Sequence, residues 1–373
     1  MKKYFLDCAS TTQPYKEVVD VVADVMYNHY GNPSSTHEMG QDAKNIIENV
    51  RNQIAEDINC KPHEVIFVSG ACEANSLAFT VAPYYLEVIT TYMEHKSIEM
   101  LRVPRTYIAN DFIGNIDLKS LKWHMSSSDF VQSKRFVSIC AANSEIGVIQ
   151  DIKAISNIVH EYNGILHIDA TQLYPERRID VKEFGIDLMS ISAQKFHGPR
   201  GIGFLYCKNG IELNELIGGS QEGGLRGGTS NTPAIAGMGK ALEMTRKLQD
   251  YRNTCIKFNR DELATKILEI PGVHLNGPSL DANRLFNNIS VCIDGVKASD
   301  LVTIASMYGL YISAGSACSS GEAVPSSTLK IIGLTDEQAL STIRITVDET
   351  LNQHDISDIA KILKNLIERL RNS

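Results

Sequence analysis

Apolar residues in the first half of the chain recur with two alternating spacings. Helical spacing, with apolar side chains every three or four positions, covers Tyr15–Tyr30 and Ala43–Ile58. Short apolar runs typical of buried strands follow, with helical stretches between several of them; they are Glu64–Val68, Leu86–Thr90, Phe136–Ala141, Ile165–Ile168, Leu188–Ile191 and Gly203–Cys207. This alternation predicts an α/β fold with a large, mainly parallel sheet that is covered by helices on both faces.

The pattern changes in the second half of the chain. Helical spacing continues from Pro233 to about Ile270, which is long for one globular helix, so we expect a break or a helix that crosses between domains. Shorter strand-like runs then alternate with helices; the runs are Val273–Leu275, Asn288–Ile293, Leu310–Ser313 and Thr342–Val347. We therefore predict a large α/β domain over residues 14–255 and a smaller α+β domain formed by residues 1–13 and 256–373.

Composition narrows the class of protein. The chain has 373 residues, 43% hydrophobic and 21% charged, which is ordinary for a globular protein. A net charge of −8 argues against broad nucleic-acid binding, and no apolar run is long enough for a membrane helix. The start MKKYFLDCAS has no long apolar region, so we expect no signal peptide. Eight cysteines form no CxxC pair, which gives no indication of a metal site or a disulfide framework and favours reduced thiols in the cytoplasm.

Two charged residues follow two of the predicted buried strands. Lys195 lies in SAQKFHGPRGIG after Leu188–Ile191, and Asp169 lies in HIDATQ after Ile165–Ile168. Either residue alone is compatible with a solvated lysine at a strand end or an aspartate in a turn. Pyridoxal phosphate uses both, because a lysine binds its aldehyde as a Schiff base and a carboxylate keeps its pyridine nitrogen protonated. The two blocks together predict pyridoxal 5'-phosphate as the cofactor.

Four further blocks could contact such a cofactor. SGACEAN opens a helix after a strand, so backbone N–H groups near Gly70 could bind phosphate. His95 could stack on a flat ring or move protons, although a single histidine is more often structural. Asn143 in AANSEIG could hydrogen-bond the phenolic oxygen. The glycine-rich block Gly218–Thr229 carries Arg226 and could contact an anion or be a flexible loop.

Two residues in the C-terminal part could carry reaction chemistry. Cys318 lies in SAGSACSSGEAVPS, where small neighbours provide no core, so we expect an exposed thiol that can act as a nucleophile if its pKa is lowered. Arg344 in STIRITV is a candidate fork for a carboxylate, or an ordinary surface arginine.

With these motifs, the chain resembles the cysteine desulfurases, which are class V, fold-type I pyridoxal-phosphate enzymes. The resemblance extends from YFLDCASTT (Tyr4–Thr12) to STIRIT (Ser341–Thr346), almost the whole chain. The small-residue loop around Cys318 is similar to the group with a long catalytic loop, whereas the other group has a His-rich loop there. The resemblance implies a fold-type I transferase with a large mixed, mainly parallel sheet domain and a smaller α+β domain that carries the Cys318 loop.

The resemblance also implies how the cofactor is held. Lys195 binds it covalently, Asp169 pairs with the pyridinium nitrogen and His95 stacks on the ring. Gln172 and Asn143 face the phenolic oxygen. The residues around the phosphate are Gly70, Ala71, Cys72, Ser192, Gln194 and, from a second subunit of a homodimer, Thr229.

The implied reaction converts L-cysteine to L-alanine. Arg344, aided by Asn143, binds the substrate carboxylate, and the freed Lys195 removes the α-proton. The Cys318 thiolate attacks the substrate sulfur and becomes a persulfide. His95 is a plausible acid or base at the substrate thiol. A sulfur-acceptor or iron–sulfur scaffold protein is the implied partner.

This chain departs from the family pattern at several positions. Cys72 stands where relatives usually have threonine, and Gln194 where they have histidine; a thiol donates more weakly than a hydroxyl, whereas an amide can replace one histidine donor. Gly223 stands where relatives often have arginine, and VDETLN follows Thr346 where they often have LGRFT. Three other functions stay open: a selenocysteine lyase, which shares every motif, an aminotransferase or other pyridoxal enzyme, which would not need Cys318, and a scaffold without activity.

Overall fold

The computed structural model of the chain describes residues 2–84, 87–127, 135–315 and 324–372. Cys318 lies outside the described residues. In the described part of the chain, no helix combines the length and the apolar content that crossing a membrane requires.

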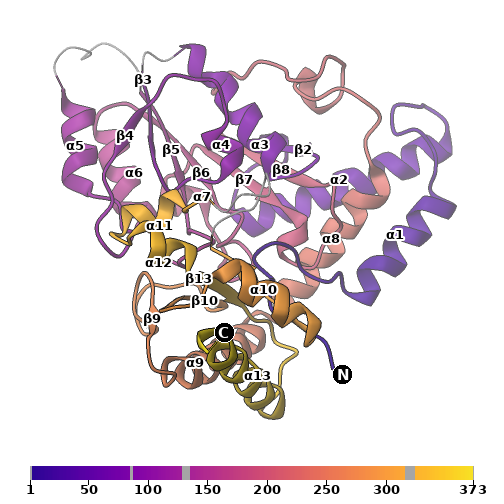
Figure 1. The fold of residues 1–373 in the computed structure, drawn as a ribbon. Coiled ribbons are helices and arrows are strands. Elements are labelled where there is room, and N and C mark those ends of the chain that lie inside the picture. Colours follow the sequence, from indigo (N-terminus) through magenta and orange to yellow (C-terminus); the bar gives the residue numbers. More distant parts are fainter. Residues whose placement is uncertain (1, 85–86, 128–134, 316–323, 373) are drawn as a thin grey trace.

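A seven-stranded sheet forms the centre of the larger part (Figure 1). In spatial order its strands are β2 (Val65–Val68), β8 (Gly203–Cys207), β7 (Leu188–Ser192), β6 (Ile165–Asp169), β5 (Arg135–Cys140), β3 (Glu87–Thr91) and β4 (Thr106–Ile108). The five strands from β7 to β4 pair in parallel, and β8 runs antiparallel to both of its neighbours. The predicted large, mixed and mainly parallel sheet is confirmed.

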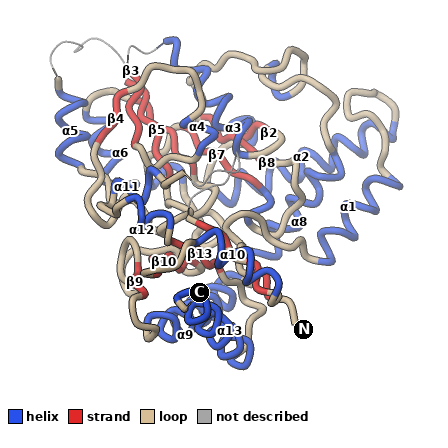
Figure 2. Tube along the Cα trace, in the orientation of Figure 1, coloured by secondary structure: helices blue, strands red, loops and turns tan. Residues whose placement is uncertain are grey.

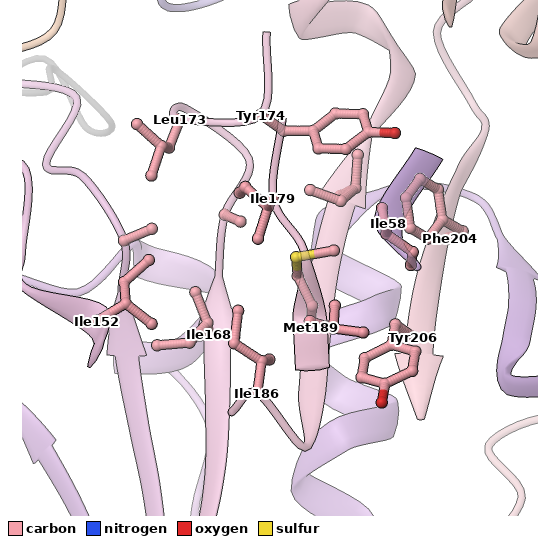
Figure 3. Close-up of a cluster of buried hydrophobic side chains, with 14 of the residues drawn as sticks. Ile58, Ile152, Ile168, Leu173, Tyr174, Ile179, Ile186, Met189, Phe204 and Tyr206 are labelled. Atoms are coloured by element: carbon pink, nitrogen blue, oxygen red, sulfur yellow. The ribbon is translucent and has the colours of Figure 1, made fainter. Parts of the chain in front are cut away.

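Helices cover both faces of this sheet. They are α1 (Lys16–Asn28), α2 (Glu38–Ile58), α3 (Ala71–Ala78), α4 (Lys96–Glu99), α5 (Leu118–Ser126), α6 (Ile152–Glu161), α7 (Val181–Phe184) and α8 (Thr232–Lys247). Alternate residues of one strand enter different cores. Phe204 and Tyr206 of β8 pack with Ile58 of α2 and Met189 of β7 (Figure 3). Leu205, between them, packs in a different cluster. Burial on both faces explains why these strands are nearly continuous apolar runs in the sequence.

The smaller part holds a second core. Its helices are α9 (Gln249–Leu268), α10 (Ala298–Met307), α11 (Ser327–Ile331), α12 (Asp336–Leu340) and α13 (Gln353–Arg371). Its antiparallel sheet has the order β12 (Ser313–Ala314), β13 (Thr342–Thr346), β10 (Asn288–Ile293) and β9 (Val273–Leu275), and β1 (Tyr4–Phe5) pairs with β11 (Leu310–Tyr311). Apolar residues from both ends of the chain and from α9, α10 and α13 form one cluster, at the bottom of Figure 2.

Three details refine the sequence predictions. The long helical stretch breaks at Leu248, which caps both α8 and α9, as expected for its length. The predicted strand Leu310–Ser313 is divided into β11 and β12, which belong to different sheets. The edge strand β4 was not predicted, because its three residues carry no apolar run. The domain boundary near residue 255 stays a prediction.

Candidate active site

The candidate residues gather where the parallel strands of the large sheet end. Asp169 is the last residue of β6, and its neighbour β7 ends at Ser192. A single 3-10 turn, Ala193–Lys195, then brings Lys195 over the same edge. Carboxyl ends of parallel strands are the usual place for ligands in such sheets, because the chain leaves the sheet there in loops.

The N-terminal segment encloses Lys195. The Lys195 ammonium donates to the backbone oxygens of Ala9 and Ser10 at 2.6 and 2.7 Å. Gln172 donates to the same Ala9 oxygen at 3.0 Å. Burial, followed by the positive charge of Arg344, lowers the pKa of Lys195 from 10.5 to about 8. The structure thus places a lysine in surroundings that favour its neutral, nucleophilic form.

Asp169 is held in a chain of polar contacts that leads to His95. The buried Asp169 carboxylate accepts from the Asn75 amide at 2.8 Å and from the backbone N–H of Thr171 at 3.1 Å. Asn75 also donates to the Ser97 hydroxyl at 2.9 Å, which bonds to His95 Nδ1 at 2.7 Å. His95 caps α4 and its side chain is exposed. Asn75 and Ser97 are positioning residues that the sequence did not reveal.

The start of α3 forms a small cradle. Its N-cap, Gly70, has a φ of 150°, and a β-carbon there would lie 3.4 Å from the Ser192 hydroxyl. Within the described part of the chain, no side chain makes a capping hydrogen bond at this end of the helix. Ala71 begins the helix, Cys72 follows with an exposed thiol, and Gln194 donates weakly to Ser10 at 3.5 Å. A helix start without a side-chain cap, beside a hydroxyl, suits a phosphate group.

Two ion pairs fix the glycine-rich loop to helices α2 and α3. Arg51 of α2 holds Glu222 with two hydrogen bonds of 2.8 and 2.9 Å, and Arg226 donates to Glu73 of α3 at 2.8 Å. Thr229, at the end of this loop, is exposed. Arg226 is therefore paired inside the chain, and Thr229 is free to meet another molecule.

Arg344, in β13, and Asn143, in the loop after β5, approach the site from distant parts of the sequence. Arg344 of β13 donates to Asp7 at 2.7 Å and to the Ser10 hydroxyl at 2.9 Å, and its Nε is buried without a partner among the described residues. The Asn143 amide donates to the Met93 oxygen at 3.0 Å and to the Thr328 hydroxyl at 3.3 Å. In this structure Asn143 thus bonds within the protein, and its predicted contacts with the cofactor and the substrate stay predictions.

The chemistry of these groups fits pyridoxal phosphate. A buried carboxylate, Asp169, suits a protonated ring nitrogen, and the amine of Lys195 suits an aldehyde. The charges of Asp169 and Arg344 both act on Lys195, so these residues share one site. The cradle at Gly70 and Ser192 suits a phosphate, because no side chain of the described residues makes a capping hydrogen bond at this helix start.

Comparisons with known proteins agree with this geometry. Residues 4–359 match the family model of aminotransferase class-V. Cysteine desulfurase IscS of Dictyoglomus turgidum is 35% identical over 384 residues, which cover 99% of this chain and 96% of the relative. A solved NifS-like protein has a TM-score of 0.90 and 28% identity over 99% of this chain and 100% of its own. A structure described as SspA in complex with cysteine has a TM-score of 0.77 and 30% identity over 93% of this chain and 99% of its own. The chain therefore belongs to the class-V aminotransferase family and, within it, to the cysteine desulfurases.

Proposed function

We propose that this protein is a pyridoxal 5'-phosphate-dependent cysteine desulfurase that moves the sulfur of L-cysteine to Cys318 and releases L-alanine. The observation that supports this most directly is the placement of Lys195 and Asp169 at the ends of neighbouring strands, in a chain similar to named cysteine desulfurases. The carbon–sulfur bond of the substrate breaks and a sulfur–sulfur bond forms. L-Cysteine and the Cys318 thiol thus give L-alanine and the persulfide, with no external oxidant or reductant.

Each residue of the site has a separate proposed role in the reaction. Pyridoxal phosphate, when bound, supplies a protonated ring that withdraws electrons from the substrate α-carbon. The Asp169 carboxylate keeps the ring nitrogen protonated, and Asn75 orients that carboxylate from behind. The Lys195 amine accepts the α-proton, and its lowered pKa makes the neutral form more accessible than in an ordinary lysine. His95 lies at the exposed end of the polar chain, which supports its assignment as the group that exchanges a proton with the substrate thiol.

Arg344 is the proposed holder of the substrate carboxylate. Its guanidinium is held by Asp7 and Ser10, while the buried Nε still lacks a partner within the described residues. A guanidinium of fixed orientation can bind a carboxylate with two parallel hydrogen bonds. This geometry supports selection of an α-amino acid with a free carboxylate.

One assay separates this function from the alternatives. The purified protein should convert L-cysteine, in the presence of a reductant, into equal amounts of alanine and sulfide. An aminotransferase would instead produce a keto acid, and a scaffold would produce nothing. Comparison of kcat/KM for L-cysteine and L-selenocysteine decides whether a selenocysteine lyase describes the protein better. The sulfur acceptor, whether an iron–sulfur scaffold or another protein, and the cytoplasmic location stay predictions from the sequence.

The pKa of Lys195 predicts the pH dependence of cofactor capture. Only the neutral amine attacks an aldehyde, and burial and Arg344 lower the pKa of Lys195 to about 8. The rate at which apo-protein captures pyridoxal phosphate should therefore rise about tenfold per pH unit below pH 8 and level off above it. Capture is measured by borohydride trapping across pH, with a lysine-containing peptide as the control for the titration of the aldehyde itself. A protein rate that follows the peptide up to pH 10 would contradict the assignment.

We also propose a homodimer that shares its active sites. Thr229 is exposed at the end of a loop that two ion pairs fix, and α1 exposes large apolar side chains at Met26 and Tyr27. Exposed apolar side chains are removed from water when two copies associate, and two-fold dimers are the commonest oligomers. Sedimentation velocity should show that the protein is a dimer. Thr229→Ala should weaken cofactor retention but leave the dimer intact. A fully active monomer is incompatible with this proposal.

A further inference from the structure

One side chain of the N-terminal segment has no assigned role in the candidate active site. The Ser10 hydroxyl accepts a hydrogen bond from Arg344 Nη2 at 2.9 Å. A hydroxyl has one hydrogen to donate as well as lone pairs that accept. Ser10 is exposed, and within the described part of the chain its hydroxyl donates to no other group. Its hydrogen is therefore available to a molecule that enters the site beside Arg344.

The backbone around Ser10 is fixed from three sides. The Ser10 N–H donates to the backbone oxygen of Asp7 at 3.0 Å, and the Ser10 oxygen accepts from the Lys195 ammonium at 2.7 Å. The N–H of the preceding residue, Ala9, donates to the buried hydroxyl of Thr346 in β13 at 2.9 Å. These bonds fix where the Ser10 hydroxyl lies, so it is a pre-oriented group on a held segment.

Much of the hydrogen-bonding capacity of Arg344 is already used inside the chain. Its Nη2 carries two hydrogens, and this nitrogen donates to the Asp7 carboxylate at 2.7 Å and to the Ser10 hydroxyl at 2.9 Å. The same nitrogen lies 3.5 Å from the Ser313 hydroxyl, and Nη1 donates to the backbone oxygen of Ser144 at 3.4 Å. The Asp7 carboxylate also offsets part of the positive charge. A substrate carboxylate at Arg344 would gain from a further donor.

The Ser10 hydroxyl has the chemistry of that further donor. A hydrogen bond from a hydroxyl to a carboxylate is assisted by the negative charge and is stronger than one between neutral groups. Because the Ser10 oxygen accepts from a guanidinium, its own hydrogen is polarised and becomes a better donor. A neutral hydroxyl also leaves the charge balance between Arg344 and Asp7 unchanged.

Ser10 contacts both the proposed carboxylate site and the proposed base. Its hydroxyl lies against Arg344, and its backbone oxygen lies 2.7 Å from the Lys195 amine. In an α-amino acid the α-carbon is one bond away from the carboxylate. A carboxylate held by the Ser10 hydroxyl therefore brings the α-proton toward Lys195, and such a fixed orientation favours its removal.

We propose that Ser10 is a further substrate-binding residue, whose hydroxyl donates a hydrogen bond to the carboxylate of the amino-acid substrate beside Arg344 and so favours ligands with a free carboxylate. This role rests on the proposed function and adds a residue to its substrate site. The attachment of the cofactor should not depend on it, because Lys195 contacts only the backbone oxygen of Ser10.

The test measures the equilibrium binding of two ligands to the cofactor-loaded protein, followed by the absorbance of the cofactor. L-Alanine has the α-carboxylate but no sulfur, so its binding is separate from sulfur transfer, and L-alaninamide has a neutral amide in place of the carboxylate. The proteins are the wild type, Ser10→Ala, Ser10→Thr and, as the control for removal of a hydroxyl, Ser357→Ala. Ser357 is exposed on α13 and donates only to the Gln353 oxygen of its own helix.

We expect Ser10→Ala to keep its cofactor and to bind L-alanine about tenfold more weakly, since a hydrogen bond to a charged group is lost. Its affinity for L-alaninamide should stay close to that of the wild type, so the preference for the carboxylate falls by the same factor. The KM for L-cysteine should rise while kcat changes little. Ser10→Thr, which keeps a hydroxyl, should retain most of the affinity for L-alanine, and Ser357→Ala should match the wild type.

Unchanged or tighter binding of L-alanine by Ser10→Ala would overturn this role, and tighter binding would show that the hydroxyl only occupies a donor of Arg344. An equal weakening of L-alanine and L-alaninamide would also overturn it, because the carboxylate would then not be what Ser10 recognises. These outcomes leave the proposed function intact as long as the wild type forms alanine and sulfide from L-cysteine. A wild-type protein that forms neither product would overturn the proposed function, and the role of Ser10 with it.

Discussion

Lys195→Ala is expected to abolish the borohydride-stable attachment of pyridoxal phosphate to the protein. Lys195 is half-buried in the turn that follows β7, its pKa is lowered to about 8, and the Asp169 carboxylate acts on its charge. No other lysine combines these features with a place at this edge of the sheet among the described residues. Loss of the residue that accepts the α-proton should also lower activity by roughly 10²- to 10⁴-fold, the contribution of a well-placed acid or base.

Lys208 provides a matched control for this experiment. It also follows a strand of the large sheet, β8, but it is half exposed and forms an ion pair with Asp187 at 2.9 Å. Lys208→Ala should retain the reducible bond to the cofactor and most of the activity. Mass spectrometry of the borohydride-reduced protein locates the cofactor. A reduced adduct that persists in Lys195→Ala would show that another amine holds it.

Cys318→Ala is expected to separate the two halves of the reaction. The thiol acts after the α-proton has been removed, so the variant should keep its cofactor and respond spectrally to L-cysteine as the wild type does. It should form no protein-bound persulfide and release almost no sulfide, because no nucleophile is left to take the sulfur. Sulfide release and persulfide labelling, measured on the same samples, check this expectation.

Cys255→Ala is the control for the removal of a thiol as such. Cys255 is a partly buried, free cysteine of α9, in the smaller part of the molecule. This variant should produce sulfide at the wild-type rate. Wild-type sulfide release from Cys318→Ala would remove Cys318 from the mechanism.

The sequence was most informative where burial is strongest. The strands from β5 to β8 are covered on both faces, so their sequences are nearly continuous apolar runs. Asp169, which ends β6, and Lys195, in the turn after β7, are easily recognised as charged residues beside these runs. β4 lies at the sheet edge, where burial is partial and the apolar signal is lost. The division between β11 and β12 depends on two partners, β1 and β13, that are distant in the sequence.

Positioning residues were harder to find for a physical reason. Asn75 is fully buried inside α3, and only the packing of α3 over β6 brings its amide to Asp169. Such roles arise from contacts between elements, which a local pattern does not contain. The place of Cys318 relative to these residues lies outside the described part of the chain.

The central claim is that the sulfur of L-cysteine passes to Cys318 while alanine is released. The most direct test is one turnover with limiting L-cysteine and no reductant, followed by mass analysis of the peptides and measurement of alanine. The account predicts one added sulfur atom on the peptide that contains Cys318, in an amount equal to the alanine formed. Alanine without added sulfur on that peptide, or a keto acid in place of alanine, would contradict it.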